Sequence, residues 1–163
     1  MNRAGRRLGI DLGDRRIGLA VAVDDLSPRG LPPMIRAEDA SADAARLAVI
    51  CKEQRIERIV IGLPLHSDGR ASEQGEKTFR WAEVVGGILQ LPMRFIDERY
   101  STARAVERVG RQGGGAGGGE PGPHRRAAYR ASIDQAAAVL ILEDEADPGL
   151  HVDPVLLRVG GGE

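Results

Sequence analysis

The sequence has few of the residues on which several classes of protein depend. Cys51 is its one cysteine, which excludes an internal disulfide framework and a cysteine-based zinc cluster. Aromatic residues make up 3% of the chain, too few for a binder that stacks many bases on aromatic side chains. No run approaches the roughly 18 apolar residues of a membrane span, and no apolar core of a signal peptide follows the charged start. We therefore expect a cytoplasmic protein without a membrane partner.

The chain also lacks a large net charge, but its charges are unevenly distributed. Lys and Arg number 23 and Asp and Glu 24, so a globally basic surface for nucleic acid is excluded. Residues 104–130 nevertheless carry six arginines against two glutamates, and residues 131–163 carry seven acids against one arginine. Arginine binds phosphate bidentately, so the basic segment, including Arg125, Arg126 and Arg130, predicts contact with a polyanion. The alternative is a merely solvated loop.

Length and composition indicate one globular domain. The 163 residues are 42% hydrophobic and 29% charged, as in ordinary folded proteins. We place the domain at residues 1–146 and expect residues 147–163 to form a frayed acidic tail. Eight glycines in the thirteen positions 110–122 predict a mobile loop over about 110–124.

The segment 7–23 has the alternation of a β-hairpin. Large aliphatic residues occupy every second position on both sides of a turn at residues 13–16. One face of both strands is therefore apolar. The other carries almost only glycine and alanine around a single carboxylate, Asp11, and would let a helix or a bulky backbone approach closely.

The rest of the sequence alternates between helical and strand patterns. Ser101 or Thr102 is suited to cap a helix that ends near residue 112, and Ser132 with Gln135 predicts a capping box that opens the last helix. A hairpin followed by such alternation predicts an α/β fold, a mixed sheet with helices on both faces. The other expected elements are strands at 34–37, 59–61 and 93–96 and helices at 42–55 and 72–89.

Three acidic residues stand out by their positions. Asp11 lies in the middle of a strand, where carboxylates are disfavoured. Glu98 follows the 93–96 strand at its carboxyl end, where open α/β sheets place ligands. Asp134 lies in the predicted first turn of the last helix, where the helix dipole favours negative charge. Brought together, three carboxylates would repel one another unless a cation joins them, and oxygen ligands select Mg²⁺ or Mn²⁺.

Each acid also has a structural explanation. Asp134 alone could be a helix stabiliser, and Glu98 could pair with Arg99 or Arg104 on the surface. Asp11 is harder to explain in this way, because a lone buried carboxylate costs several kcal/mol unless it is paired. Two metal ions on shared carboxylates are a common arrangement for phosphodiester cleavage, so the set points to a nuclease.

Four segments in this order resemble the YqgF/RuvX family of ribonuclease H-like proteins: LGIDLGDRRIG, IVIGLPLHSDG, FIDERYST and SIDQAAAVLIL. The resemblance covers roughly residues 7–143. Members are described as candidate Holliday junction resolvases and candidate pre-16S rRNA nucleases. It implies a five-stranded mixed sheet of order 3-2-1-4-5 with strand 2 antiparallel, and a metal-dependent nuclease site. The family's catalytic and metal-binding acids fall on Asp11, Glu98 and Asp134.

The sequence departs from the family pattern at two places. The glycine-rich insert interrupts the basic stretch that usually leads into the last helix, and Asp14 and Arg15 stand where many relatives carry Thr and Lys. We expect substrate contacts from residues of these motifs and of the basic segment: Arg15, Arg99, Ser101, Thr102, Arg125, Arg126 and Arg130.

These observations favour a metal-dependent endonuclease in the 5′-end maturation of precursor 16S rRNA. The first alternative is a Holliday junction resolvase, which would need two sites related by two-fold symmetry and hence a homodimer. A phosphate-loop ATPase would need two such domains around its nucleotide, and 163 residues hold one. A non-catalytic nucleic-acid-binding module would be marked by loss of the acids, and all three are present.

Overall fold

One mixed β-sheet forms the centre of the protein. The computed structural model describes residues 5–99, 101–110 and 119–159. Within these residues six strands are hydrogen-bonded in the order β3-β2-β1-β4-β5-β6. The five-stranded order predicted from the sequence is confirmed, with β2 antiparallel to both neighbours and β1, β4 and β5 parallel. The strands are β1 (Arg6–Leu12), β2 (Arg16–Val23), β3 (Arg29–Ile35), β4 (Arg58–Leu63), β5 (Met93–Asp97) and β6 (His151–Val152).

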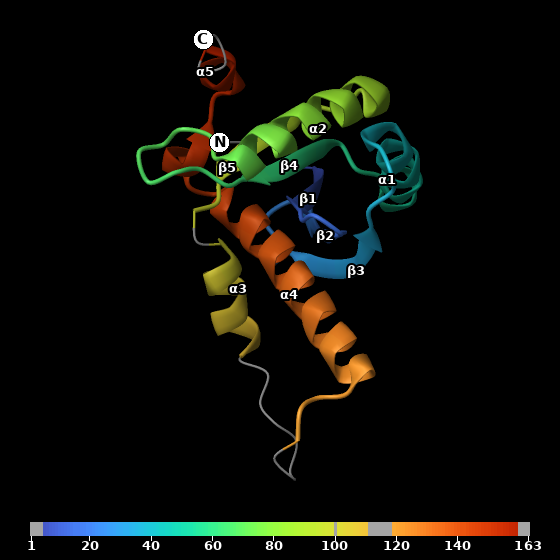
Figure 1. The fold of residues 1–163 in the computed structure, drawn as a ribbon. Coiled ribbons are helices and arrows are strands. Elements are labelled where there is room, and N and C mark those ends of the chain that lie inside the picture. The colour runs from blue at the N-terminus through green and yellow to red at the C-terminus, as the bar shows by residue number, and fades with distance from the viewer. Residues whose placement is uncertain (1–4, 100, 111–118, 160–163) are drawn as a thin grey trace.

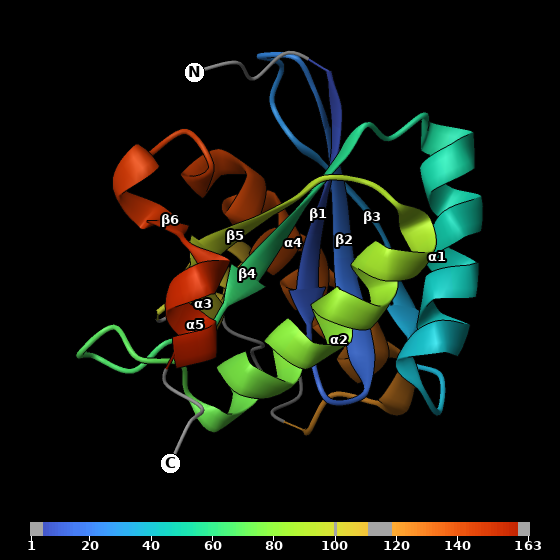
Figure 2. The same cartoon turned by 90° about the horizontal axis from the view of Figure 1, so that it is seen from above.

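Helices cover both faces of the sheet, as expected (Figures 1 and 2). Helices α1 (Ala40–Gln54) and α2 (Glu73–Leu89) lie on one face. Helices α3 (Ser101–Val109) and α4 (Pro123–Asp144) lie on the other, and α4 crosses β1, β2 and β3. No helix of the described residues is long and apolar enough to cross a membrane.

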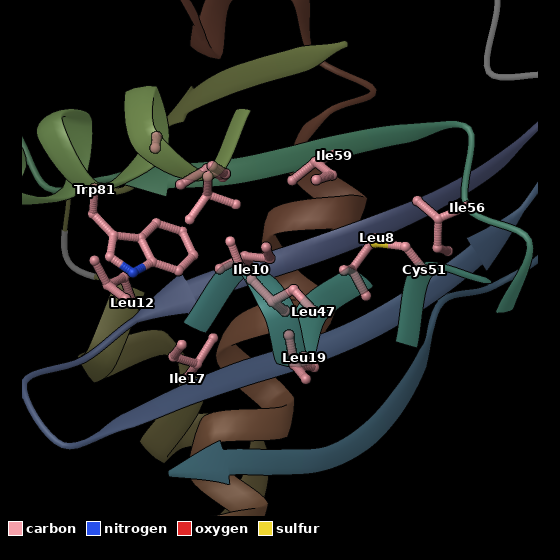
Figure 3. Close-up of a cluster of buried hydrophobic side chains, with 14 of the residues drawn as sticks. Leu8, Ile10, Leu12, Ile17, Leu19, Leu47, Cys51, Ile56, Ile59 and Trp81 are labelled. Carbon is pink, nitrogen blue, oxygen red and sulfur yellow. The ribbon is translucent and has the colours of Figure 1, made fainter. Parts of the chain in front are cut away.

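The apolar face of the predicted hairpin forms the main core with α1 and α2 (Figure 3). Leu8, Ile10, Ile17 and Leu19 are completely buried there. Burying each such side chain contributes about 1.5–3 kcal/mol relative to leaving it in water. Trp81 closes the core, and its indole N–H donates to the buried carboxylate of Asp43 at 3.0 Å.

Helix α4 packs closely against the glycine- and alanine-rich face of the hairpin. A Cβ atom at Gly18 would overlap the backbone of Asp134, and one at Gly9 would lie 2.8 Å from the carbonyl oxygen of Ala138. The small residues of β1 and β2 therefore let the helix backbone lie directly against the sheet. This packing places Asp134 of α4 beside the strand that carries Asp11.

The structure corrects two expected boundaries. Strand β3 covers residues 29–35 instead of 34–37, because an edge strand can accommodate its two prolines at positions that do not donate to the ladder. Helix α4 begins at Pro123, well before the expected capping box, since proline is favoured in the first turn of a helix. Ser132 lies inside this helix, and its hydroxyl donates to the carbonyl of Ala128 at 3.0 Å.

The segment expected to be a frayed tail contains defined elements. A short 3₁₀ helix (Pro148–Leu150) leads into β6, which pairs with the edge of β5, and α5 (Pro154–Val159) follows. His151 Nε2 lies 2.8 Å from the carbonyl oxygen of Glu145, which ties this segment to the end of α4. Of the predicted mobile loop, residues 111–118 lie outside the described part of the chain, and residues 123 and 124 belong to α4.

Candidate functional site

Two of the three predicted acids lie at the carboxyl ends of the parallel strands β1, β4 and β5. These strands are parallel, so their carboxyl ends meet at one edge. Asp11 is the second-to-last residue of β1, and Glu98 directly follows the last residue of β5. The backbone N–H of Glu98 donates to the carbonyl of Leu63 at the end of β4, at 3.0 Å. Asp134 reaches the same region from α4.

Asp11 and Asp134 are electrostatic neighbours. Burial, and next the negative charge of Asp134, raise the pKa of the Asp11 carboxyl to about 6. Because α4 begins at Pro123, Asp134 lies in the middle of the helix and not in its first turn. The helix dipole therefore does not stabilise this carboxylate. The explanation of Asp134 as a stabiliser of the first helical turn, suggested by the sequence, is wrong.

The cation paired with Asp134 is Arg16, which the sequence interpretation did not single out. Arg16 Nε lies 2.6 Å from Asp134 Oδ2, and the two side chains are 31% and 16% exposed. The period of two in β2 could have identified it: Arg16 has the same parity as Gly18, and Gly18 pairs with Asp11 across the hairpin. Arg16 therefore belongs to the strand face that carries the acid.

Glu98 is buried with no hydrogen-bond donor from the described part of the chain to its carboxyl group, and its hydrogen-bond partner is the carboxylate of Asp144. Its residue is 4% exposed, and neither carboxylate oxygen has a donor among the described residues. Burial, the adjacent carboxylate of Asp144 and, to a smaller extent, the charge of Asp11 raise the pKa of Glu98 to about 9. Its methylene groups pack over Gly62, where a Cβ would lie 2.7 Å from Glu98 Cγ. A buried carboxylate without a donor is expensive in a purely structural role.

Asp144, at the end of α4, is a fourth carboxylate beside this region that the sequence interpretation missed. It accepts two hydrogen bonds from Arg104 of α3, at 2.7 and 3.1 Å. Although partial burial opposes ionisation, the Arg104 guanidinium and contact with Glu98 lower the pKa of Asp144. These opposite pKa shifts favour the proton on Glu98 and the negative charge on Asp144.

The donor chemistry of these acids fits a hard divalent cation. Only carboxylate oxygens are offered. No donor of the described residues reaches the buried oxygens of Glu98, and Asp11 and Asp134 repel each other; a cation would relieve both conditions. The described residues do not, however, form a ready group of three ligands. Asp134 is paired with Arg16, and Glu98 lies against Asp144. Holding one cation between Asp11, Glu98 and Asp134 therefore requires side-chain movement.

The residues expected to touch substrate near this edge have different surroundings. The Arg99 guanidinium pairs with Asp97 at 2.9 Å and donates to the carbonyl of Ser67 at 2.8 Å, so it ties the 66–70 loop to the end of β5. Arg15 is exposed in the hairpin turn, and Thr102 is exposed on α3. Ser101 begins α3, and its side chain lies outside the described structure.

The predicted basic residues lie on the first turns of α4. Arg125, Arg126 and Arg130 are exposed there, and Arg126 donates to the carbonyl of Pro121 at 2.7 Å. Positive side chains near a helix N-terminus add to the positive end of the helix dipole. The resulting field is unfavourable for the helix by itself and favourable for a bound anion. In Figure 1 this end of α4 extends beyond the sheet.

The arrangement of sheet and helices defines an α/β protein of the ribonuclease H-like class. A solved structure of T. thermophilus RuvC in complex with a Holliday junction substrate has the same fold, with a TM-score of 0.50 and 16% identity, covering 90% of this chain and 98% of that chain.

Sequence comparison gives the family. The chain belongs to the RuvX family, whose model is described as a Holliday junction resolvase and matches residues 5–147. A relative from Synechococcus elongatus, named "Putative pre-16S rRNA nuclease", is 37% identical over 142 residues, which cover 86% of this chain and 87% of the relative. A relative of the same name from Thermosynechococcus vestitus is 35% identical over 155 residues, which cover 94% and 95% of the two chains.

Proposed function

We propose that this protein is a metal-dependent endonuclease that hydrolyses phosphodiester bonds in the 5′-end maturation of precursor 16S rRNA. The observation that carries the proposal is the pair of carboxyls, half-buried Asp11 and buried Glu98, at the edge where three parallel strands end. The charge of Asp11 raises the pKa of Glu98, so the two groups interact. The names of the two cyanobacterial relatives favour ribosomal RNA as substrate.

The residues of the chain have separable roles in this proposal. Asp11, Glu98 and Asp134 would hold Mg²⁺ or Mn²⁺, which when bound would activate water and stabilise the leaving oxygen. The close packing of α4 on Gly18 keeps Asp134 beside Asp11. Arg125, Arg126 and Arg130 would bind the phosphate backbone away from the cleaved bond, where arginine can pair with phosphate oxygens in any sequence.

A second candidate is cleavage of four-way DNA junctions. The description of the matching family as a Holliday junction resolvase favours it. An all-carboxylate site reads neither a base nor a 2′-hydroxyl group, so the substrate must be distinguished by binding surfaces outside the acids. Resolution of a junction also requires two sites related by two-fold symmetry, and it therefore predicts a homodimer.

The test offers both substrates to the purified full-length protein with Mn²⁺: an RNA with a 5′ leader joined to 16S sequence, and a synthetic four-way DNA junction. Asp11→Asn should reduce the cleavage rate on the order of 10³-fold, because it removes one negative ligand. The same substitution should leave the melting temperature in chelator unchanged or raise it, since a buried repelling charge is lost.

Asp14→Asn is the matched control. Asp14 is an exposed carboxylate in the adjacent hairpin turn, so its substitution removes the same charge without touching the site. It should retain cleavage. Full activity of Asp11→Asn, or of the wild type in excess chelator, would contradict the metal-dependent mechanism. Binding of nucleic acid without cleavage at any Mn²⁺ concentration would indicate a non-catalytic binding module.

A further inference from the structure

Arg16 is a positive charge in direct contact with Asp134. It begins β2 with the same parity as Gly18, the residue opposite Asp11, and its Nε lies 2.6 Å from Asp134 Oδ2. This contact joins residues that are 118 positions apart in the chain. Helix α4 packs directly against Gly18 of β2. The two residues of the ion pair, Arg16 and Asp134, are therefore held by elements that are in close contact.

The ion pair has a clear electrostatic consequence. Asp134 and Asp11 repel each other, and the Arg16 guanidinium provides the compensating charge on one side of that pair. Both side chains of the ion pair are partly buried, so it is screened less by water than an exposed pair. Arg16 occupies Oδ2, so a divalent cation that binds Asp134 through this oxygen, or through both oxygens, competes with the guanidinium.

Resting on the nuclease function proposed above, we infer that Arg16 and a divalent cation compete for Asp134. Arg16 is then a positioning residue: it compensates the charge of Asp134 and must be displaced from Oδ2 when the cation takes this oxygen. The protein binds the cation more weakly than its three acids alone would allow, because the ion pair with Arg16 has to be broken first. A guanidinium that instead preorganised Asp134 for the cation would have the opposite effect.

Titration calorimetry with Mn²⁺, without nucleic acid, measures the competition. Arg16→Gln should bind Mn²⁺ about tenfold more tightly than the wild type, which corresponds to about 1.4 kcal/mol. Arg16→Lys retains a positive charge within reach of Asp134 and should stay closer to the wild type. Arg15→Gln is the matched control: it removes the same charge from the neighbouring exposed position and should change the Mn²⁺ affinity at most about twofold, because its field is screened by water.

A second measurement needs no variant. The Nε–H resonance of Arg16 in the wild-type protein should shift when Mg²⁺ is added, as the short contact with Asp134 is lost. Equal or weaker Mn²⁺ binding by Arg16→Gln than by Arg15→Gln, or an unchanged Arg16 resonance at saturating Mg²⁺, would overturn the competition alone. Failure of the wild type and every variant to bind Mn²⁺ would overturn both the competition and the metal-dependent function.

Discussion

The protein buries two glutamates in opposite surroundings. Glu145, at the end of α4, is 2% exposed and lies within 3.1 Å of three arginines. Glu98, after β5, is 4% exposed, and its oxygens have no hydrogen-bond donor among the described residues. The arginines around Glu145 are Arg7 of β1 at 3.0 Å, Arg58 of β4 at 2.5 Å and Arg94 of β5 at 3.1 Å.

This difference separates a structural carboxylate from a candidate ligand. The charge of Glu145 is compensated inside the molecule, and it joins α4 to three neighbouring strands. Glu98 is desolvated to a similar extent, but another carboxylate, Asp144, lies beside it, and the nearby cation Arg104 pairs with Asp144. A buried group that is left uncompensated reduces stability, and such groups are found where a site needs them. The two glutamates should therefore respond in opposite directions to the same substitution.

The largest effect is expected at the compensated glutamate. Glu145→Gln leaves three guanidinium groups facing one another without a negative charge, and breaking a buried ion pair in this way costs about 3 kcal/mol or more. Urea unfolding at pH 7 should show this loss as a lower midpoint with an unchanged slope. A loss below about 1 kcal/mol would show that the cluster is not the anchor of α4 that its contacts indicate.

The reverse effect is expected at Glu98. Its raised pKa means that the folded protein holds a proton between about pH 4.5 and pH 9 that the unfolded chain releases. The stability of the wild type should therefore fall as the pH rises through this range. Glu98→Gln lacks this group, and its amide can donate to Asp144, so at pH 8 in chelator it should be more stable by about 2 kcal/mol.

A pH series distinguishes the titration of Glu98 from an effect of the substitution on side-chain packing. The advantage of Glu98→Gln should fall below about 0.5 kcal/mol at pH 4.5, where Glu98 is protonated in the folded wild type and about half protonated in the unfolded chain. Thermal melting of both proteins from pH 4.5 to 8.5 in chelator measures it. A constant difference across the series, or a less stable variant at pH 8, would contradict the assignment of Glu98 as an uncompensated carboxyl.

The sheet was predictable from the sequence because its signals are local. The alternation of aliphatic and small residues over 7–23 fixes the hairpin and its two faces, and short apolar runs identify β4 and β5. The weaker predictions concerned elements that depend on tertiary contacts. The two-residue strand β6 exists through pairing with β5, and the first turns of α4 carry like charges that give no helical signal.

The acids of the candidate site could be identified from the sequence, but the residues that pair with them could not. Asp11, Glu98 and Asp134 are conspicuous by position, and their assignment as catalytic residues stays a prediction. The partners Arg16 and Asp144 were missed because each contact joins segments far apart in the chain. One signal for Asp144 was available: three consecutive acids, 143–145, end α4, where the helix dipole disfavours negative charge unless cations are near.

The smallest loss of stability is expected for the ion pair of Glu143, a third glutamate, near the end of α4. Glu143 precedes Asp144 on α4 and accepts two hydrogen bonds from Arg108 of α3, both of 2.9 Å. The pair is bidentate, but the side chains of Arg108 and Glu143 are 46% and 39% exposed. Arg108→Gln should therefore change the free energy of unfolding by no more than about 0.5 kcal/mol, because water and salt screen an exposed pair. Urea unfolding at low and at high salt measures it, and the small loss should shrink further as salt is added. A loss comparable to that of Glu145→Gln would mean that pairing geometry, and not burial, determines how these carboxylates contribute, and the contrast between Glu145 and Glu98 would then need another explanation.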